Sequence, residues 1–197
     1  LHAARTYQPE WPYLLATMYI RFPLMLTRTR LLIILCLLPV MRGSADNVIP
    51  ISDMRAAYLY NFVVFTEWPD SSRDAINICL LPSQATLVNV RLLATKHING
   101  RPLRILEPNQ GDTNECQLLY IGQTMDSGTR QTLTKLAGSP VLTVGEGSQS
   151  QAMIQMNVEN KRLSFNVDLV QSRRANLTIS SKLLRLAKSV RKEDDGS

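Results

Sequence analysis

The sequence is poor in the side chains that catalysis and metal binding require. It holds two histidines and three cysteines among 197 residues, and beyond residue 45 these reduce to His97, Cys79 and Cys116. A Ser–His–Asp or Cys–His arrangement would have one candidate base, and His97 precedes a turn, where a solvated surface position is expected. A zinc site needs three or four Cys or His ligands. We therefore expect no enzyme, no metal and no cofactor.

Phosphate-binding glycine patterns and paired carboxylates are also missing. The segment Gly145-Glu146-Gly147 follows a predicted strand without opening a helix, so it does not match a phosphate-cradling loop. We interpret it as a mobile loop. Glu67 and Asp168 are isolated carboxylates, with nothing in the sequence to indicate that they converge.

No hydrophobic run is long enough to cross a bilayer. The run over residues 31–41 contains Pro39, whereas a membrane helix needs about 20 apolar residues. It follows a basic segment that starts at Met25 and precedes Gly43-Ser44-Ala45, an order typical of a cleaved secretory signal. We expect cleavage after Ala45, leaving a mature chain of residues 46–197 that does not span the membrane. Residues 1–24 are either untranslated or a longer basic region.

The excess of positive charge belongs mainly to this signal. The whole sequence has 22 basic and 16 acidic residues, a net charge of +6. Residues 1–45 contain five Arg and one Glu, which leaves 17 basic and 15 acidic residues and a net +2 for residues 46–197. A nearly neutral chain lacks the electrostatic footprint of a nucleic-acid-binding protein. Nucleic acid is therefore not an expected partner.

The mature chain has the pattern of one α/β domain. Short apolar runs at 76–81, 102–106, 116–121 and 140–144 predict strands, and they alternate with predicted helices at 52–67, 84–95 and 126–137. This alternation predicts a single-domain α/β sandwich with a mixed, mostly parallel sheet. Asn99-Gly100 predicts a turn, and Pro102 predicts an edge-like strand because proline cannot donate to a ladder.

The last third changes to a period of two. Apolar residues alternate with polar ones on either side of Asn160-Lys161, so residues 152–158 and 163–169 predict a C-terminal antiparallel hairpin with one buried face. A final helix is predicted from Ser180, with Leu183, Leu186, Ala187 and Val190 toward the core. Its basic outer stripe, which includes Lys182 and Arg185, is typical of a solvated face.

Cys79 and Cys116 are an even pair in an exported chain, which indicates a disulfide. In a common doubly wound strand order their strands are neighbours, close to the Cα separation that a bridge needs. The alternative is two buried thiols.

Aromatic residues are scarce, at 6% of the chain, and they gather in residues 58–69. Tyr58, Tyr60, Phe62, Phe65 and Trp68 lie in this segment, and helical spacing relates Met54, Tyr58, Phe62 and Phe65. We expect a buried amphipathic helix that stops at Pro69, with the Trp68 ring packed against the sheet.

This string resembles the opening motif of the YfiR/HmsC-like family of secreted bacterial proteins. Further likenesses lie at residues 99–103, 116–121, 163–169 and 180–187, so the resemblance covers about 50–190. It implies a non-enzymatic periplasmic regulator that represses an inner-membrane diguanylate cyclase, or a sensor protein, by contacting its periplasmic portion. Cyclic di-GMP and biofilm formation would then be under its control.

The chain departs from that family at several places. Gln151-Ala152 replaces the usual glycines before the hairpin, Asn160-Lys161 replaces an Asn-Gly turn, and a further cysteine pair of some members is absent. A type I′ turn is therefore less favourable here. A redox role that rests on that second cysteine pair does not transfer to this chain.

We expect the partner contact in the C-terminal third, with four candidates: Asn166, Asp168, Lys182 and Arg185. Each of them is also explained as an ordinary solvated residue. A homodimer is left open. A second hypothesis is a small-ligand-binding module, with a crevice at the strand ends near residues 82–83 and 122–124. A secreted hydrolase is a weaker third.

Overall fold

The computed structural model describes residues 49–69, 73–81, 84, 87–108, 113–123 and 125–193. The predicted signal segment and its cleavage position after Ala45 lie outside these residues. Within them, α/β structure with a mixed, mostly parallel sheet is confirmed.

The main sheet has the strand order β10-β8-β7-β6-β5-β2-β4-β3. Its pairs are parallel except for the β7–β8 hairpin and the β3–β4 pair. The strands are β2 (Ile76–Leu80), β3 (His97–Ile98), β4 (Arg101–Leu106), β5 (Leu118–Gly122), β6 (Leu142–Glu146), β7 (Ile154–Glu159), β8 (Arg162–Asp168) and β10 (Ser189–Arg191). A separate small sheet pairs β1 (Thr66–Glu67) with β9 (Thr178–Ile179).

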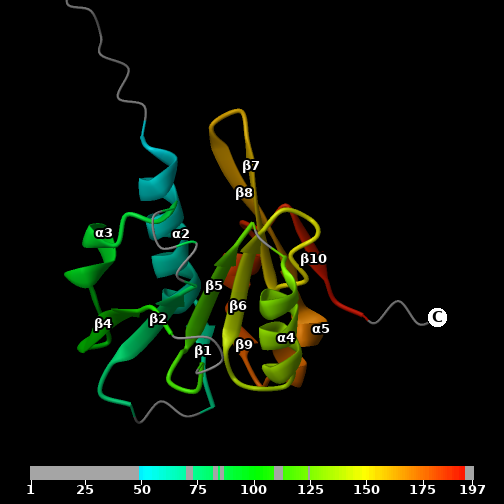
Figure 1. Cartoon of the computed structure of the whole chain (residues 1–197), viewed down its shortest axis with the longest axis horizontal. Coiled ribbons are helices and arrows are strands. Elements are labelled where there is room, and N and C mark those ends of the chain that lie inside the picture. The colour runs from blue at the N-terminus through cyan, green and yellow to red at the C-terminus, as the bar shows by residue number, and fades with distance from the viewer. Residues whose placement is uncertain are drawn as a thin grey trace, which may run out of the picture. The chain divides into compact units, whose positions relative to one another are not determined.

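The central strands are covered on both faces, which explains why their sequences are mostly apolar. Every residue of β2, β5 and β6 is buried, as parallel strands between two helical layers require. Helix α2 (Ile51–Val64) contributes Leu59 and Phe62 to the larger core, whereas α4 (Ser127–Lys135) and its C-cap Leu136 border a second core. Figure 1 shows α2 and α4 on opposite faces of the sheet.

The predicted helix over 52–67 is right in position but too long. Helix α2 ends at Val64, and the following residues Thr66–Glu67 form β1. The backbone N–H of Ser180 also donates to the carbonyl of Phe65 at 2.8 Å. Pairing with the later segment satisfies backbone groups that another helical turn would otherwise use, so the helix stops before Pro69 is reached.

The prediction of a helix over 84–95 is largely wrong. Among the described residues of this range, only α3 (Arg91–Ala94) is α-helical. Its buried residue Leu93 belongs to the larger core. Apolar spacing alone therefore predicted too long a helix. The helix that forms is short, and its buried residue is Leu93.

The predicted final helix is also wrong beyond its first turn. Helix α6 (Ser181–Leu184) begins after a Ser180 N-cap, but the chain then returns to the sheet as β10. Leu183 is buried as expected, whereas Leu186 is 70% exposed. Forming β10 in place of a longer helix is favourable because β10 pairs in parallel with β8, whose outer backbone groups would otherwise lack hydrogen-bond partners.

Two tight turns set the hairpin registers. Asn99 and Gly100 both have positive φ and connect β3 to β4. Asn160 and Lys161, at φ 51° and 60°, connect β7 to β8, and Glu159 is paired with Arg162 across the turn. The chain thus adopts the primed turn despite the missing glycine. The hairpin extends beyond the ends of the neighbouring strands (Figure 1).

The Cys79–Cys116 disulfide is confirmed, with the Cα atoms 5.7 Å apart. It joins β2 to the residues just before β5, and these strands are neighbours. Closing the 37-residue separation stabilises the fold by at most about 3.8 kcal/mol in the chain-entropy description.

Candidate functional site

A buried charge cluster lies where α2 crosses the ends of β5 and β6. The guanidinium of Arg55 donates from Nε to Glu146 Oε1 and from Nη2 to Oε2, the latter at 3.0 Å. Tyr120 OH donates to Oε1 at 2.7 Å, and Gln123 Nε2 donates to Oε2 at 2.9 Å. The prediction of a mobile loop at Gly145-Glu146-Gly147 is therefore wrong, because Glu146 is fixed at the end of β6.

The cluster holds its charges in their ionised forms. Burial by itself would raise the pKa of the Glu146 carboxyl, but the hydrogen bonds from Arg55, Tyr120 and Gln123 outweigh it and the pKa is lowered. The hydrogen bond to Glu146 raises the pKa of Arg55. Burial, followed by the bond to the carboxylate, raises the pKa of Tyr120 far above its usual range. We interpret the cluster as a structural clamp between α2 and the sheet.

Described side chains occupy part of the end of the sheet where the ligand-binding hypothesis placed its crevice. Gln84 packs so closely on Gly122 that a Cβ atom there would lie 1.9 Å from Gln84 Oε1. The Arg55–Glu146 pair occupies the adjacent end of β6. Residues 82, 83 and 124 of that predicted crevice lie outside the described residues.

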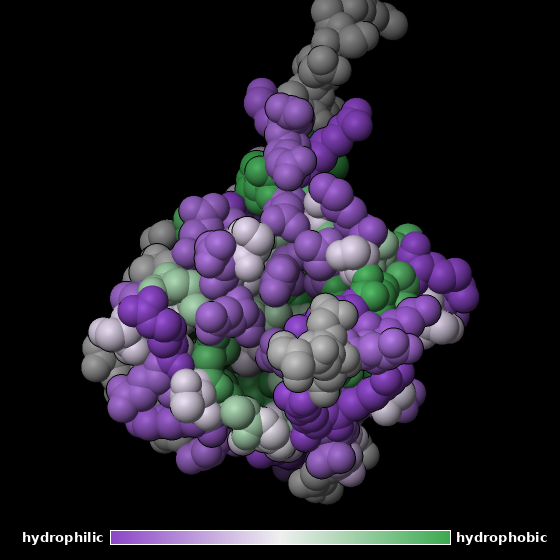
Figure 2. Space-filling model, turned by 90° about the vertical axis from the view of Figure 1, so that its right-hand side faces the viewer, coloured by the Kyte–Doolittle hydropathy of each residue, from purple (hydrophilic) through white to green (hydrophobic). Residues whose placement is uncertain are grey.

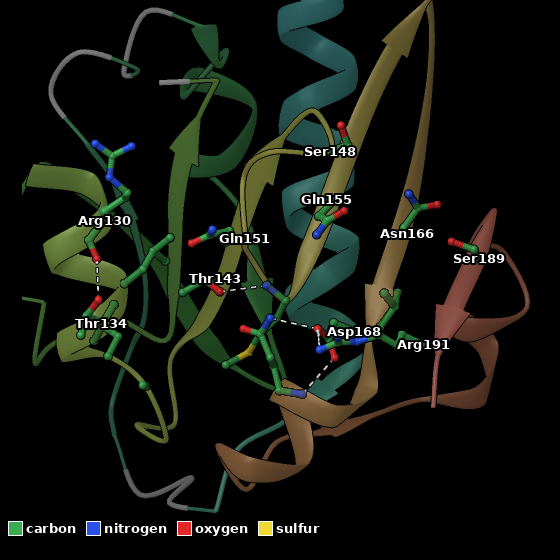
Figure 3. Close-up of a pocket in the computed structure, with 16 residues that line it drawn as sticks. Arg130, Thr134, Thr143, Ser148, Gln151, Gln155, Asn166, Asp168, Ser189 and Arg191 are labelled. Atoms are coloured by element: carbon green, nitrogen blue, oxygen red, sulfur yellow. Dashed lines mark hydrogen bonds and ion pairs between the residues drawn. The ribbon is translucent and has the colours of Figure 1, made fainter. Parts of the chain in front are cut away.

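A polar groove opens elsewhere, on the sheet face that α4 leaves uncovered. It has a volume of about 630 Å³ and runs from α4 across β6, β7 and β8 to β10. Figure 3 shows side chains from each of these elements around it. We define the polar groove by six of its lining residues: Thr134, Thr143, Gln151, Gln155, Asn166 and Ser189.

Strand register explains why the groove is polar. Gln155, Asn166 and Ser189 are partners on β7, β8 and β10, so they form one row on the same face. The next row, Ile154, Val167 and Val190, follows the same register. In the groove row, the Oδ1 atom of Asn166 is buried and accepts no hydrogen bond from the described residues.

The structure separates the four predicted partner-binding residues. Asn166 and Asp168 both line the groove. Asp168 has a clear structural role, because its carboxylate caps α5 (Leu169–Arg174) by accepting from the Gln171 N–H at 3.0 Å and pairs with Arg191. Lys182 and Arg185 are exposed on and after α6 and do not line the groove.

The aromatic side chains of residues 58–69 make contacts within the domain. The rings of Tyr58, Phe62 and Phe165 meet edge to face, with centroids 5.1 to 5.9 Å apart. The exposed Pro69 follows Trp68, which is half-buried and donates from Nε1 to the Gln117 carbonyl at 3.2 Å. The Tyr60 ring lies under the Lys96 ammonium at 5.9 Å.

Sequence reasoning missed Arg55 and Glu146. A signal was available for Arg55, because it directly follows Met54 on a helix whose other inward positions are apolar. For Glu146 the signal was a carboxylate two residues after the predicted strand at 140–144. Neither pattern shows that the two residues, 91 positions apart, meet.

His97 is exposed on β3, as predicted. The part of the chain that the structure describes holds no group of three or more His, Cys, Asp or Glu side chains placed to bind a metal ion. Among the same residues, no helix combines the length and apolar character that crossing a bilayer demands.

Comparison with known proteins gives one informative match. A model of the YfiR/HmsC-like family matches residues 52–188, from the first turn of α2 to the residue before β10. No curated protein matches the chain significantly.

Proposed function

We propose that this chain, which belongs to the YfiR/HmsC-like family, is a non-enzymatic periplasmic regulator that represses an inner-membrane diguanylate cyclase by protein–protein contact. The observation that carries the proposal is the family match, which spans nearly the whole described domain. The family is known for this repression and is generally regulatory rather than catalytic. The buried charge cluster, which is structural, offers no competing chemistry.

The periplasmic location is supported by two features. The Cys79–Cys116 bridge belongs to the class of structural disulfides that persist in oxidising compartments. The sequence over residues 25–45 has the order of a cleaved signal. Periplasmic protein should therefore begin at Asp46 on N-terminal sequencing. Recovery of an intact N-terminus from the cytoplasm would contradict the location and the partner together.

We propose the polar groove as the contact surface for the cyclase. It presents amide and hydroxyl groups on rigid strands, and its central residue Asn166 has an acceptor that the described residues leave unsatisfied. A partner that donates a hydrogen bond there would remove the cost of a buried unpaired oxygen. This keeps Asn166 as a contact residue, whereas Asp168 serves mainly to hold α5 and β10 in place.

The function is tested by deletion and complementation. Deleting the gene should raise cyclic di-GMP and surface attachment, and the exported protein should restore both, whereas a form without residues 1–45 should not. Unchanged cyclic di-GMP after deletion would contradict the proposal.

The contact surface is tested separately with a matched pair of variants. Gln155→Trp places a large neutral side chain in the groove, and Gln131→Trp places the same one on the exposed face of α4, where it does not line the groove. Gln155→Trp should abolish repression and pull-down of the cyclase, whereas Gln131→Trp should retain both. If the two folded variants repress and bind the cyclase equally, the groove is not part of the contact surface.

A small-ligand-binding module is the second candidate, and the volume of the groove, about 630 Å³, is what favours it. Tight binding of a small solute by the purified protein, together with unchanged cyclic di-GMP on deletion, would replace the regulator with this function.

A further inference from the structure

The segment of residues 159–192 is strongly basic although residues 46–197 as a whole are nearly neutral. Residues 159–192 contain nine Lys or Arg and two acidic residues, a net charge of +7. Residues 46–158 contain eight basic and ten acidic residues, a net charge of −2. Three further acids, Glu193, Asp194 and Asp195, follow at the end of the sequence. The near-neutral total therefore conceals two regions of opposite sign.

The basic residues of this region all lie at the surface. Each of the nine is exposed, whereas one of the two acids, Asp168, is buried and paired with Arg191. The other acid, Glu159, is exposed beside Arg162. We call six of the cations the basic flank: Arg162, Arg173, Lys182, Arg185, Lys188 and Lys192.

The fold brings members of the basic flank together from separate elements. Arg162 on β8 and Lys188 line one surface hollow at the base of the hairpin turn. Arg173 on α5 donates to the carbonyl of Lys192 at 3.1 Å, which places α5 beside the end of β10. Lys182 and Arg185 belong to the segment that leads from α6 into β10. Figure 2, which views the side where β10 lies in Figure 1, shows a mainly hydrophilic face with apolar patches between.

An exposed apolar residue accompanies these charges. Leu186, between Arg185 and Lys188, is 70% exposed and is the most exposed of the large hydrophobic residues described. Large apolar side chains flanked by cations are typical of surfaces that enter the headgroup region of a bilayer.

We propose that the basic flank binds the surface of a lipid bilayer that carries anionic phospholipid headgroups, with Leu186 entering the headgroup region. Charge complementarity favours this occupant, because the cations are spread over β8, α5, α6 and β10 rather than gathered around one pocket. A bilayer presents phosphates over a wide area and attracts each nearby cation independently. The inference does not require the cyclase, and it accounts for Lys182 and Arg185, which the groove does not use.

Binding to the bilayer raises the local concentration of the protein at the membrane surface. A regulator held at the membrane surface searches two dimensions for a membrane-bound partner, and electrostatic attraction speeds the encounter. The polar groove and the basic flank meet near β10, since Ser189 lines the groove and Lys188 belongs to the flank.

The test is co-sedimentation of the purified exported protein with vesicles, without any cyclase. Vesicles of phosphatidylcholine with about one third phosphatidylglycerol should bind the protein, and pure phosphatidylcholine should not. Binding should fall steeply between about 50 and 500 mM NaCl, because salt screens the attraction. Equal binding to both vesicle types, or none to either, would overturn the proposal.

A matched pair of triple variants locates the surface. Lys182→Gln/Arg185→Gln/Lys188→Gln removes three flank charges and should weaken binding by roughly 100-fold, at about fivefold per cation. Arg91→Gln/Arg104→Gln/Lys135→Gln removes the same charge from exposed positions elsewhere and should change binding by less than about threefold. Equal losses in the two variants would overturn the assignment to the flank.

A C-terminal truncation tests whether removing negative charge strengthens binding to anionic vesicles. Removing residues 193–197 takes away the three acids that follow Lys192 in the sequence, so binding to anionic vesicles should become stronger. Unchanged or weaker binding would count against the proposal. One combination of results would assign the flank to a protein. If the flank triple variant no longer pulls down the cyclase and the wild-type protein does not bind vesicles, the flank contacts an acidic protein segment and the lipid assignment is wrong.

The two proposals fail separately. Gln155→Trp should still bind anionic vesicles while losing repression, because it changes the groove and no charge. Loss of vesicle binding in folded Gln155→Trp would contradict a lipid contact confined to the flank.

Discussion

Arg55 on α2 and Glu146 at the end of β6 are 91 positions apart in the sequence and form a buried ion pair. Their side chains are 11% and 2% exposed. The pair therefore joins the first helix of the domain to the middle of the sheet. Ionised groups so far from water are tolerated only when they satisfy each other, and Tyr120 and Gln123 complete the set.

Breaking this pair should destabilise the domain strongly. Arg55→Met leaves the Glu146 carboxylate buried without its countercharge, and we expect a loss of about 3–5 kcal/mol in the free energy of unfolding. Urea denaturation at neutral pH measures it. Adding Glu146→Gln should recover part of the loss, and exposed Arg91→Met should change stability by less than about 0.5 kcal/mol. A loss below about 1 kcal/mol in Arg55→Met would contradict the clamp.

Acid should remove the contribution of the same cluster. The pKa of Glu146 is lower in the folded state than its usual value of 4.5, so the unfolded chain binds the proton first as pH falls. The stabilisation is therefore complete above about pH 4.5 and is lost progressively as pH falls below it, toward the folded-state pKa. Glu146→Gln lacks this titration. Urea midpoints of the two proteins should converge as pH falls below about 4.5, and a constant difference would refute the linkage.

Trp68 should contribute both packing and a hydrogen bond. The ring is half-buried and Nε1 donates to the Gln117 carbonyl at 3.2 Å. Trp68→Ala should cost about 2–3 kcal/mol, less than a fully buried tryptophan, and Trp68→Phe about 1 kcal/mol. Thermal melting provides the measurement. If Trp68→Ala melts like the wild type yet loses the partner, Trp68 is a binding residue.

The hairpin turn should be improvable. Lys161 adopts φ 60°, a left-handed conformation that costs a side-chain-bearing residue about 1–2 kcal/mol. Lys161→Gly should therefore stabilise the protein by about 0.5–1 kcal/mol after the greater entropy of glycine in the unfolded chain is counted. Lys135→Gly, in the last turn of α4, should destabilise by a similar amount. Destabilisation by Lys161→Gly in urea titration would show that the turn is unstrained.

Most of the elements that carry a short-range sequence pattern were predicted correctly. The buried strands β2, β5 and β6, the hairpin of β7 and β8, and helix α4 each carry a short-range signal. The Cys79–Cys116 bridge could be inferred once the two strands were taken as neighbours.

What the sequence did not reveal depends on contacts between distant segments. β1 exists because β9 pairs with it, and β10 exists because β8 offers an open side. In each case a backbone ladder with a remote partner overrode a helical pattern. The polar groove has the same origin, since Gln155, Asn166 and Ser189 become neighbours only through the strand order.

The short strand β10 has a consequence for any shortened form of the chain. The family match ends at residue 188, one position before Ser189 opens β10. A chain cut at that boundary would leave the backbone amides and carbonyls of residues 166–168 of β8 bare on their outer side, as a template on which a second molecule could add a strand. We therefore expect a three-residue strand at the rim of the sheet to protect the protein from self-association, out of proportion to its size.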